Sequence, residues 1–284
     1  MSYWFEQTLN GISYGMLLFL LTAGLSLITG LMGIVNLAQG SYYLFAAYIG
    51  LSVINATQNF VLAILAGALA VALLGAVMQR FFLHRFYKND LAQVLMTFGF
   101  LFVFQDLALM NWGGNSYLLP PPSFLEQSIR VGDIIYPSYR VFVILMGLLV
   151  AGGLWWFQER TKIGAIVRAG VDDEEMLRGL GVNVPLLFTA VFALGAGLAG
   201  LSGVLGGPFA GVAPGMDLQV LLLGFVVLIV GGLGSLRGAF VASLLVGLLD
   251  NFGKALFPDL ALFTIFAPMA IILAIKPSGL FGRA

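Results

Sequence analysis

One short stretch of this chain gathers side chains that can form ion pairs and hydrogen bonds. Nine of the 26 charged residues fall within the 26 positions from Gln158 to Asn183. They are Glu159, Arg160, Lys162, Arg168, Asp172, Asp173, Glu174, Glu175 and Arg178. Nearly everything on either side of this stretch is apolar, so its charges stand out as a place where something else can bind. The stretch is therefore the first candidate for contact with a partner.

The other polar side chains offer little for catalysis. Gly200-Leu201-Ser202-Gly203 matches the Gly-x-Ser-Gly pattern of rhomboid proteases, but a serine nucleophile needs a nearby base. The only histidine, His84, lies in a basic loop, and the absence of cysteine excludes thiol catalysis. The Gly-x-x-x-x-Gly-Lys-[Ser/Thr] pattern that grips nucleotide phosphates is missing from the sequence. We expect no enzyme activity and no bound cofactor from this chain alone.

Composition places these residues in a membrane protein. The chain is 60% hydrophobic and 9% charged, whereas soluble domains carry about 25% charged residues. No charged residue occurs from Gln7 to Gln79, a run of 73 positions, and one spanning helix needs about 20 apolar residues. The apolar runs are continuous rather than alternating, which excludes a β-barrel and predicts helices. The net charge of zero gives no reason to expect nucleic acid as a partner.

These runs predict an all-α polytopic membrane protein, a single bundle of about eight or nine spans that occupies residues 1–284. The predicted spans are 8–29, 38–55, 60–79, 91–110, 140–157, 184–207, 218–232, 238–256 and 260–275. The second and the seventh each abut a glycine-rich break. Within the sixth, Gly195, Ala199 and Gly203 recur every four residues, which favours close helix packing inside the bundle.

The distribution of Lys and Arg predicts the orientation of the bundle. With the N-terminus outside, ten basic residues lie on the inner side and three, Arg130, Arg140 and Lys254, on the outer side. Segment 158–183 and the C-terminus then face the cytosol of a bacterial-type inner membrane, and the spans face lipid. The longest outer loop, 111–139, contains Pro120-Pro121-Pro122 and is expected to form an ordered extracytoplasmic cap.

The polar stretch contains a predicted short helix. Asp172 is placed to cap it, and Glu175 follows three residues later as in a capping box. Gly179 and Gly181 supply a stop, so the helix is expected from Asp173 to Leu180. Its apolar positions are Val171, Met176, Leu177 and Leu180. An isolated helix of this length is marginal in water, so it lies on the membrane surface as a solvated turn or fits a groove on another protein.

Two glycine-rich breaks, Gly30 to Gly40 and Gly231 to Gly238, interrupt the apolar runs. Paired breaks in two halves of a transporter indicate its pathway, because unwound backbone is tolerated where it lines a cavity. The candidate path residues are Asn36, Gln39, Ser41, Gly232, Gly234 and Ser235. Their uncharged groups suit a weakly held zwitterion. The alternative is that Asn36 and Gln39 join neighbouring helices through structural hydrogen bonds.

Ionisable residues at the span ends are the remaining candidates. Asp106 lies near the outer end of the fourth span, and Asp250 precedes Lys254 by four residues in the eighth. Both positions favour a solvated or paired structural role over ion coupling. A secondary transporter or channel for a small polar solute is the alternative function. It would need an ion or proton site, and the spans hold few acids or bases to build one.

Several motifs together resemble one family, the permeases of branched-chain amino acid ABC importers (LivH-like). Arg168-Ala169, the Asp172–Glu175 run and Arg178-Gly179-Leu180-Gly181-Val182-Asn183 resemble its cytoplasmic loop. The family's N-terminal pattern is similar to Asn10-Gly11 with Gly15 and to residues 33–40. Its C-terminal patterns are similar to residues 231–236 and to Pro277-Ser278-Gly279-Leu280-Phe281-Gly282. The resemblance covers essentially the whole chain.

The resemblance implies a permease subunit that pairs with a second permease, identical or different. It also implies two cytosolic ATP-binding subunits, which hold the ATP and Mg, and an extracytoplasmic solute-binding protein. The family's coupling segment, which seats in an ATPase groove, corresponds here to Arg168, Asp172, Glu174, Glu175, Met176, Leu177, Arg178 and Leu180. Branched-chain amino acids are the family's usual cargo, and related permeases carry urea, amides or aromatic acids.

Overall fold

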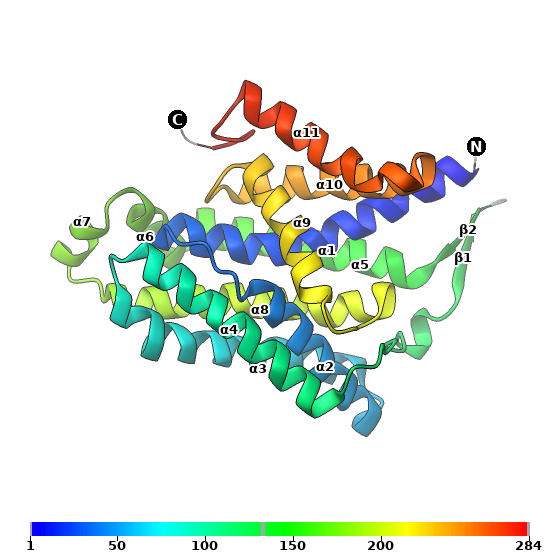
Figure 1. Cartoon of the computed structure of the whole chain (residues 1–284), viewed down its shortest axis with the longest axis horizontal. Coiled ribbons are helices and arrows are strands. Elements are labelled where there is room, and N and C mark those ends of the chain that lie inside the picture. Colours follow the sequence, from blue (N-terminus) through cyan, green and yellow to red (C-terminus); the bar gives the residue numbers. More distant parts are fainter. Residues whose placement is uncertain (1, 132–133, 283–284) are drawn as a thin grey trace.

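Helices dominate the structure, a computed structural model that describes residues 2–131 and 134–282 (Figure 1). Within these ranges, the side chains of residues 2, 131, 134, 172 and 174 lie outside the description. The long helices are α1 (Ser2–Met32), α2 (Gln39–Thr57), α3 (Phe60–Val77), α4 (Asp90–Trp112), α5 (Ser138–Arg160), α8 (Val184–Ala210), α9 (Met216–Gly231), α10 (Leu236–Leu256) and α11 (Ala261–Ile275). The shorter elements are η1 (Met78–Phe82), η2 (Leu83–Phe86), η3 (Ser123–Leu125), β1 (Ser128–Val131), β2 (Ile134–Pro137), α6 (Lys162–Asp172), α7 (Glu174–Gly179) and η4 (Pro258–Leu260).

Each predicted span corresponds to one long helix of the described chain, which confirms an all-α polytopic membrane protein. Within the residues that the structure describes, seven helices are long and apolar enough to cross a membrane. The two outside that set are the predicted second and seventh spans, α2 and α9. Helix α2 carries several polar residues, and α9 has 16 residues, fewer than the roughly 20 that a full span needs. The count of eight or nine spans is therefore approximate.

Helix α1 forms the centre of the bundle. It packs against α5, α8, α9 and α10, and 89% of its most apolar window is buried, against 6% for the window that includes α11. Helix α2 is enclosed by α3, α4, α8 and α9. The peripheral helices expose apolar rows, and that of α3 comprises Val61, Leu65, Leu69 and Leu73. An exposed row of this kind is typical of a surface that lipid covers.

Small residues allow α8 to lie against three neighbours, as their spacing predicts. A Cβ atom added to Gly195 would lie 2.9 Å from the Gly24 carbonyl oxygen of α1. One added to Gly200 would lie 3.1 Å from the Ala68 Cα atom of α3. Ser202 is buried and donates a hydrogen bond of 2.8 Å to the Leu17 carbonyl. Ser202 therefore serves helix packing in this fold.

The loop between α4 and α5 is ordered by a hairpin and a backbone bridge. Strands β1 and β2 pair antiparallel with Ser128 opposite Pro137. Tyr117 exchanges two backbone hydrogen bonds, of 2.8 and 2.7 Å, with Val212 in the α8–α9 connection. The buried Tyr136 hydroxyl lies 3.2 Å from the Ser13 hydroxyl, and burial raises the pKa of Tyr136 above its ordinary value. The only helical turn in this loop's described part is the 3-10 turn η3.

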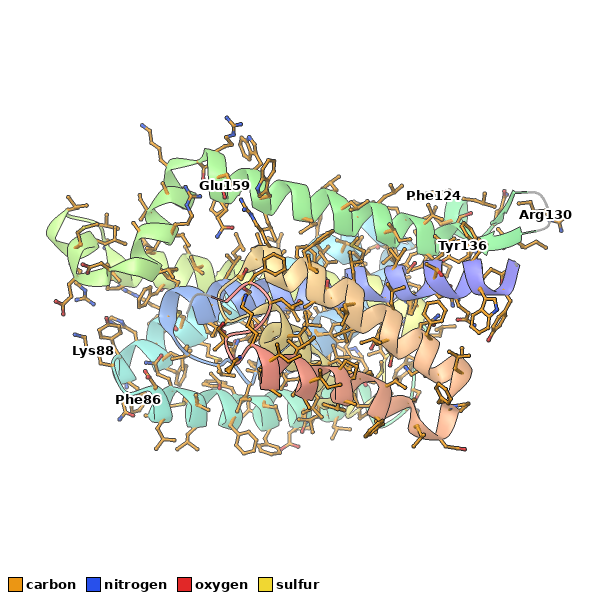
Figure 2. The ribbon with its side chains drawn as sticks, turned by 90° about the horizontal axis from the view of Figure 1, so that it is seen from above. Phe86, Lys88, Phe124, Arg130, Tyr136 and Glu159 are labelled. Carbon is orange, nitrogen blue, oxygen red and sulfur yellow. The ribbon has the colours of Figure 1, made fainter. Side chains whose placement is uncertain are left out.

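The bundle has two distinct ends, which we call the α7 end and the hairpin end. Figure 1 shows α6, α7 and the C-terminus at one end, and β1, β2 and the N-terminus at the other. Figure 2 shows Phe86, Lys88 and Glu159 toward the α7 end, and Phe124, Arg130 and Tyr136 at the hairpin end.

Candidate coupling and translocation site

The polar segment 158–183 folds into two capped helices at the α7 end. The Thr161 hydroxyl accepts a hydrogen bond from the Gly164 amide and caps α6. The Asp173 carboxylate accepts one of 2.9 Å from the Met176 amide and caps α7. Gly181 follows α7 with a φ of +81°, a left-handed conformation suited to glycine, as the predicted stop requires.

The predicted cap at Asp172 is wrong by one residue. Helix α6 continues through Asp172, and Asp173 is the residue that adopts the extended backbone of a cap. Two adjacent aspartates are equally able to cap, so the choice depends on where α6 ends, which the local pattern did not contain. The capping box with Glu175 is lost with this shift, and the Asp172 side chain lies outside the described residues.

The buried side chain of Leu177 packs α7 against the bundle. Leu177 is buried in a cluster with Leu31, Val167, Val184 and Phe188. The other predicted apolar positions are exposed: Val171 by 42%, Met176 by 52% and Leu180 by 71%. Helix α7 is thus anchored through Leu177 and leaves an apolar surface uncovered within the described chain.

The η2–α4 connection lies beside α7 and contributes charge and an aromatic ring. Lys88 Nζ lies 3.6 Å from Glu175 Oε1, and the Arg178 guanidinium lies 5.2 Å from the centroid of the Tyr87 ring. Both charges of the first pair are well exposed, so this pair contributes little to stability. These contacts place α7 beside the η2–α4 connection. The side chain of Glu174 lies outside the described residues.

Glu159 joins the polar segment to the second break. Its Oε2 atom lies 3.8 Å from Arg168 Nη1 on α6, and its Oε1 atom lies 3.2 Å from Arg237 Nη2 at the start of α10. All three side chains are more than one-third exposed, so each pair contributes below about 1 kcal/mol. The Glu159 carboxylate therefore links α6 to α10, two helices that are distant from each other in the sequence.

A cavity of about 680 Å³ lies between these elements at the α7 end. Its walls come from the polar segment, both glycine-rich breaks and the C-terminal turn. The lining includes Glu159, Arg168 and Val171, then Thr29, Gly30 and Gly33, then Gly234, Ser235 and Arg237, and finally Pro277, Ser278 and Phe281. Gly234 and Ser235 are predicted path residues, and Arg168 is a predicted coupling residue, so the fold brings the two sets together here.

The two breaks touch each other. A Cβ atom added to Gly30 would lie 2.8 Å from the Gly234 Cα atom, and Gly234 has a φ of +74°. Ser235 caps α10 by accepting a hydrogen bond of 3.0 Å from the Gly238 amide. Gly232, with a φ of +98°, packs against the C-terminal turn. Glycine at these positions therefore permits close backbone contact at one end of the cavity.

The predicted path residues of the first half are buried and bonded. Asn36 donates to Gln39 Oε1 at 3.1 Å and accepts from the Ala38 amide at 3.1 Å. Gln39 donates to the Gly195 carbonyl of α8 at 2.9 Å and to the Leu21 carbonyl of α1 at 3.4 Å. Both side chains are fully buried. In this conformation these bonds join α1, α2 and α8, the arrangement that the alternative of structural hydrogen bonds describes.

Sequence reasoning missed one buried acid, Asp217. Its side chain is fully buried in the first turn of α9. The Oδ2 atom accepts hydrogen bonds from Gln105 Nε2 at 2.7 Å and from Ser41 Oγ at 3.4 Å. The predicted span began at 218, which placed Asp217 in a loop, whereas α9 begins at Met216. An acid within one residue of a span boundary was the available signal.

The acids that sequence reasoning did consider have ordinary surroundings. Asp250 is largely buried and pairs with Lys254 at 2.7 Å, one helical turn away. Lys254 also lies 5.7 Å from the centroid of the Tyr14 ring. Asp106 is exposed near the end of α4. The pairing of Asp250 and the exposure of Asp106 agree with the predicted surroundings, and Asp106 also lines a small cavity between α2, α4 and α9.

The class of protein follows from three features of the fold. These are apolar helices with exposed faces, two glycine-rich breaks and a polar segment at one end, and together they are typical of a multi-pass membrane permease. A family model described as the permease component of branched-chain amino acid transport systems matches residues 7–274. The chain belongs to this family. It is thus a permease subunit of an ABC importer and a multi-pass inner-membrane protein, and the family is one of transporters rather than enzymes.

Individual relatives are similar over the full length. The high-affinity branched-chain amino acid permease BraD of Pseudomonas aeruginosa is 25% identical over 296 residues, which cover 99% of this chain and 96% of the relative. The corresponding LivH of Escherichia coli K12 is 25% identical with the same coverage. The fructose import permease FrcC of Rhizobium meliloti is 25% identical over 55% of this chain and 43% of its own length. No solved structure matches the chain.

Proposed function

We propose that this chain forms the translocation path of an importer for branched-chain or closely related amino acids. The observation that carries the proposal is the cavity at the α7 end, which the polar segment and both breaks line together. Arg168 and Val171 of α6 line this cavity, so a movement of α7 that displaces the adjoining α6 would change its walls. The solute assignment is supported by the full-length similarity to BraD and LivH, whose names specify branched-chain amino acids.

Coupling is assigned to the polar segment, residues 158–183. Its exposed positions at Met176 and Leu180, next to the charges of Glu175 and Arg178, suit a groove on a cytosolic ATP-binding subunit. Two such subunits hold the ATP and Mg, since this sequence lacks the phosphate-binding pattern. Arg168 transmits the motion through Glu159 to Arg237 and the second break.

The remaining partners follow from the same assignment. A second permease subunit completes the membrane domain, and a solute-binding protein docks at the hairpin end, where loop 111–139 lies. The α7 end then faces the cytosol and the N-terminus faces outward, in agreement with ten basic residues against three. Asn36, Gln39 and Ser41 close the path in this conformation, while Gly232, Gly234 and Ser235 form its opening at the α7 end.

Reconstitution tests this function. The permease, its ATP-binding subunits and the solute-binding protein are purified and placed together in liposomes, and ATP hydrolysis and uptake are measured with and without leucine. We expect leucine to stimulate hydrolysis and to accumulate only when ATP is present. Flux of leucine through the permease alone, driven by a gradient, would contradict the proposal.

A further inference from the structure

A second cavity, of about 300 Å³, lies between α2, α4 and the start of α9, away from the α7 end. Its volume is at the lower end of the range for small-molecule sites, about 300–1,000 Å³. The lining combines apolar side chains, including Leu44, Leu109 and Leu218, with the polar groups of Tyr48 and Gln105 and the carboxylate of Asp106. This mixture suits a small solute that has an aliphatic part and a polar part.

A buried carboxylate lies behind this lining. Gln105, a lining residue, donates its amide to Asp217 Oδ2 at 2.7 Å. Among the described residues, Asp217 Oδ1 has no hydrogen-bond partner although it is buried, and the same holds for the Tyr48 hydroxyl. Two buried polar groups, one in the lining and one behind it, are therefore left without partners.

Burial of this kind is costly unless a ligand provides the missing bonds. An ionisable side chain within a membrane bundle marks a functional site by default, and an unpaired buried charge is strongly unfavourable. The position of Asp217 in the first turn of α9 complements the helix dipole, and Gln105 and Ser41 bond only its Oδ2 atom. These contacts leave the buried Oδ1 atom without a donor.

We propose that Asp217 binds the ammonium group of the transported amino acid, with the aliphatic side chain against Leu44, Leu109 and Leu218. An ammonium group carries three donors and no acceptor, which matches one free carboxylate oxygen. Among the residues that the structure describes, no basic side chain lines this cavity. An anionic solute that lacks an ammonium group is therefore disfavoured. The inference rests on the proposed amino-acid import, and it names which part of the solute this subunit recognises.

The experiment uses the complex of permease and ATP-binding subunits in nanodiscs, without the solute-binding protein. Equilibrium binding of tritiated leucine is measured for the wild type, for Asp217→Asn and for the control Asp259→Asn, which makes the same change at an exposed acid between α10 and α11. Asparagine has the shape of aspartate and still accepts the Gln105 bond. Because a charge-assisted bond is lost, we expect at least about tenfold weaker binding for Asp217→Asn and unchanged binding for Asp259→Asn.

Competition then identifies the recognised group. Isopentylamine retains the ammonium group and lacks the carboxylate, whereas 4-methylpentanoate retains only the carboxylate. We expect the amine to displace leucine from the wild type and the acid and sodium ions to be ineffective. The inference is overturned if the wild type does not bind leucine at millimolar concentration, if Asp217→Asn binds as the wild type does, or if the acid or sodium competes equally. Uptake with the binding protein present tests import independently, so the two can fail separately.

Discussion

At the scale of single residues, Glu159 has the most consequential position, because it contacts both the polar segment and the second break. We predict that Glu159→Gln lowers leucine uptake at least about threefold and changes the free energy of unfolding by less than about 1 kcal/mol, since its ion pairs are partly exposed. Uptake and hydrolysis in liposomes measure the coupling, and denaturation in detergent measures the stability.

The matched control is Glu126→Gln, which neutralises an exposed glutamate near the hairpin end. It should leave the ratio of uptake to hydrolysis unchanged. A charge exchange, Glu159→Arg with Arg237→Glu, preserves one of the two pairs and should restore part of the uptake. If Glu159→Gln transports at the wild-type ratio, the link between α6 and α10 through Glu159 plays no part in coupling.

Substitution of Asn36 distinguishes the two hypotheses for the first break, a role in the translocation path and a role in structural hydrogen bonding. Asn36→Leu removes hydrogen bonds to Gln39 and to the Ala38 amide. A buried polar group left without a partner costs about 1–3 kcal/mol, so we predict a loss of stability of this order together with slower uptake. Thermal unfolding of the purified permease measures it, with the exposed Asn111→Leu as control. Wild-type stability with slow uptake would instead assign Asn36 to the path alone.

Residue types alone could identify some of these sites but not their surroundings. The sequence showed that Asn36 and Gln39 are polar groups in an apolar region, and only the fold shows that they bond to each other and to Gly195. Asp217 was missed because it precedes the apolar run by one residue. Its partners, Gln105 and Ser41, lie more than a hundred positions away along the chain. A local sequence pattern cannot predict hydrogen bonds between residues so far apart in the sequence.

At the scale of elements, α7 is short enough that its cap should control whether it forms. We predict that Asp173→Ala removes the bond to the Met176 amide and destabilises α7 by about 1 kcal/mol. Hydrogen exchange of the amides in 176–179 should accelerate about fivefold, and uptake should fall with it.

The control for this cap is Asn59→Ala, which removes the equivalent bond at the start of α3, donated by the Leu62 amide to Asn59 Oδ1. Exchange should then rise near 60–63 and leave α7 and uptake unaffected. If Asp173→Ala accelerates exchange in α7 while uptake stays normal, a fully formed α7 is not required for coupling.

The elements themselves were largely predictable, because a bilayer imposes a minimum length on apolar runs. Each of the nine predicted spans corresponds to a long helix of the described chain. The two predicted spans beside the breaks, α2 and α9, are too polar or too short to be counted among the helices that can cross a membrane. Helix α6 and the β1–β2 hairpin were not predicted. Both are stabilised by neighbours distant in sequence: Val167 of α6 by Leu31 of α1, and Tyr136 of the hairpin by Ser13.

At the scale of the whole molecule, the two cavities lie toward opposite ends of the bundle. The smaller one is beside Asp217 near the start of α9, and the larger one is beside Gly234 just after the end of α9. Helix α9 thus connects both sites, and Figure 1 shows it crossing the direction of the other long helices. A helix in this position can alter both cavities in one movement, as alternating access requires.

The docking of the α7 end to the ATP-binding subunits is testable by reversing its charges. Glu174→Arg combined with Arg178→Glu places a base at the first turn of α7 and an acid at its last turn. Each reversed charge opposes the helix dipole, at a cost of about 0.3–1 kcal/mol, and presents the wrong sign to the partner. We predict that the double variant inserts into the membrane normally but loses uptake and no longer co-purifies with the ATP-binding subunits.

The chain offers a control with the same spacing at the opposite end. Glu126→Arg combined with Arg130→Glu exchanges an acid and a base four positions apart, both exposed, in the loop between α4 and α5. Because this loop lies at the hairpin end, its exchange should leave co-purification of the ATP-binding subunits unchanged even if docking of the solute-binding protein weakens. Normal uptake by the Glu174→Arg, Arg178→Glu variant would remove the coupling role from α7. Equal loss of the ATP-binding subunits in both variants would show that the effect is not specific to the α7 end.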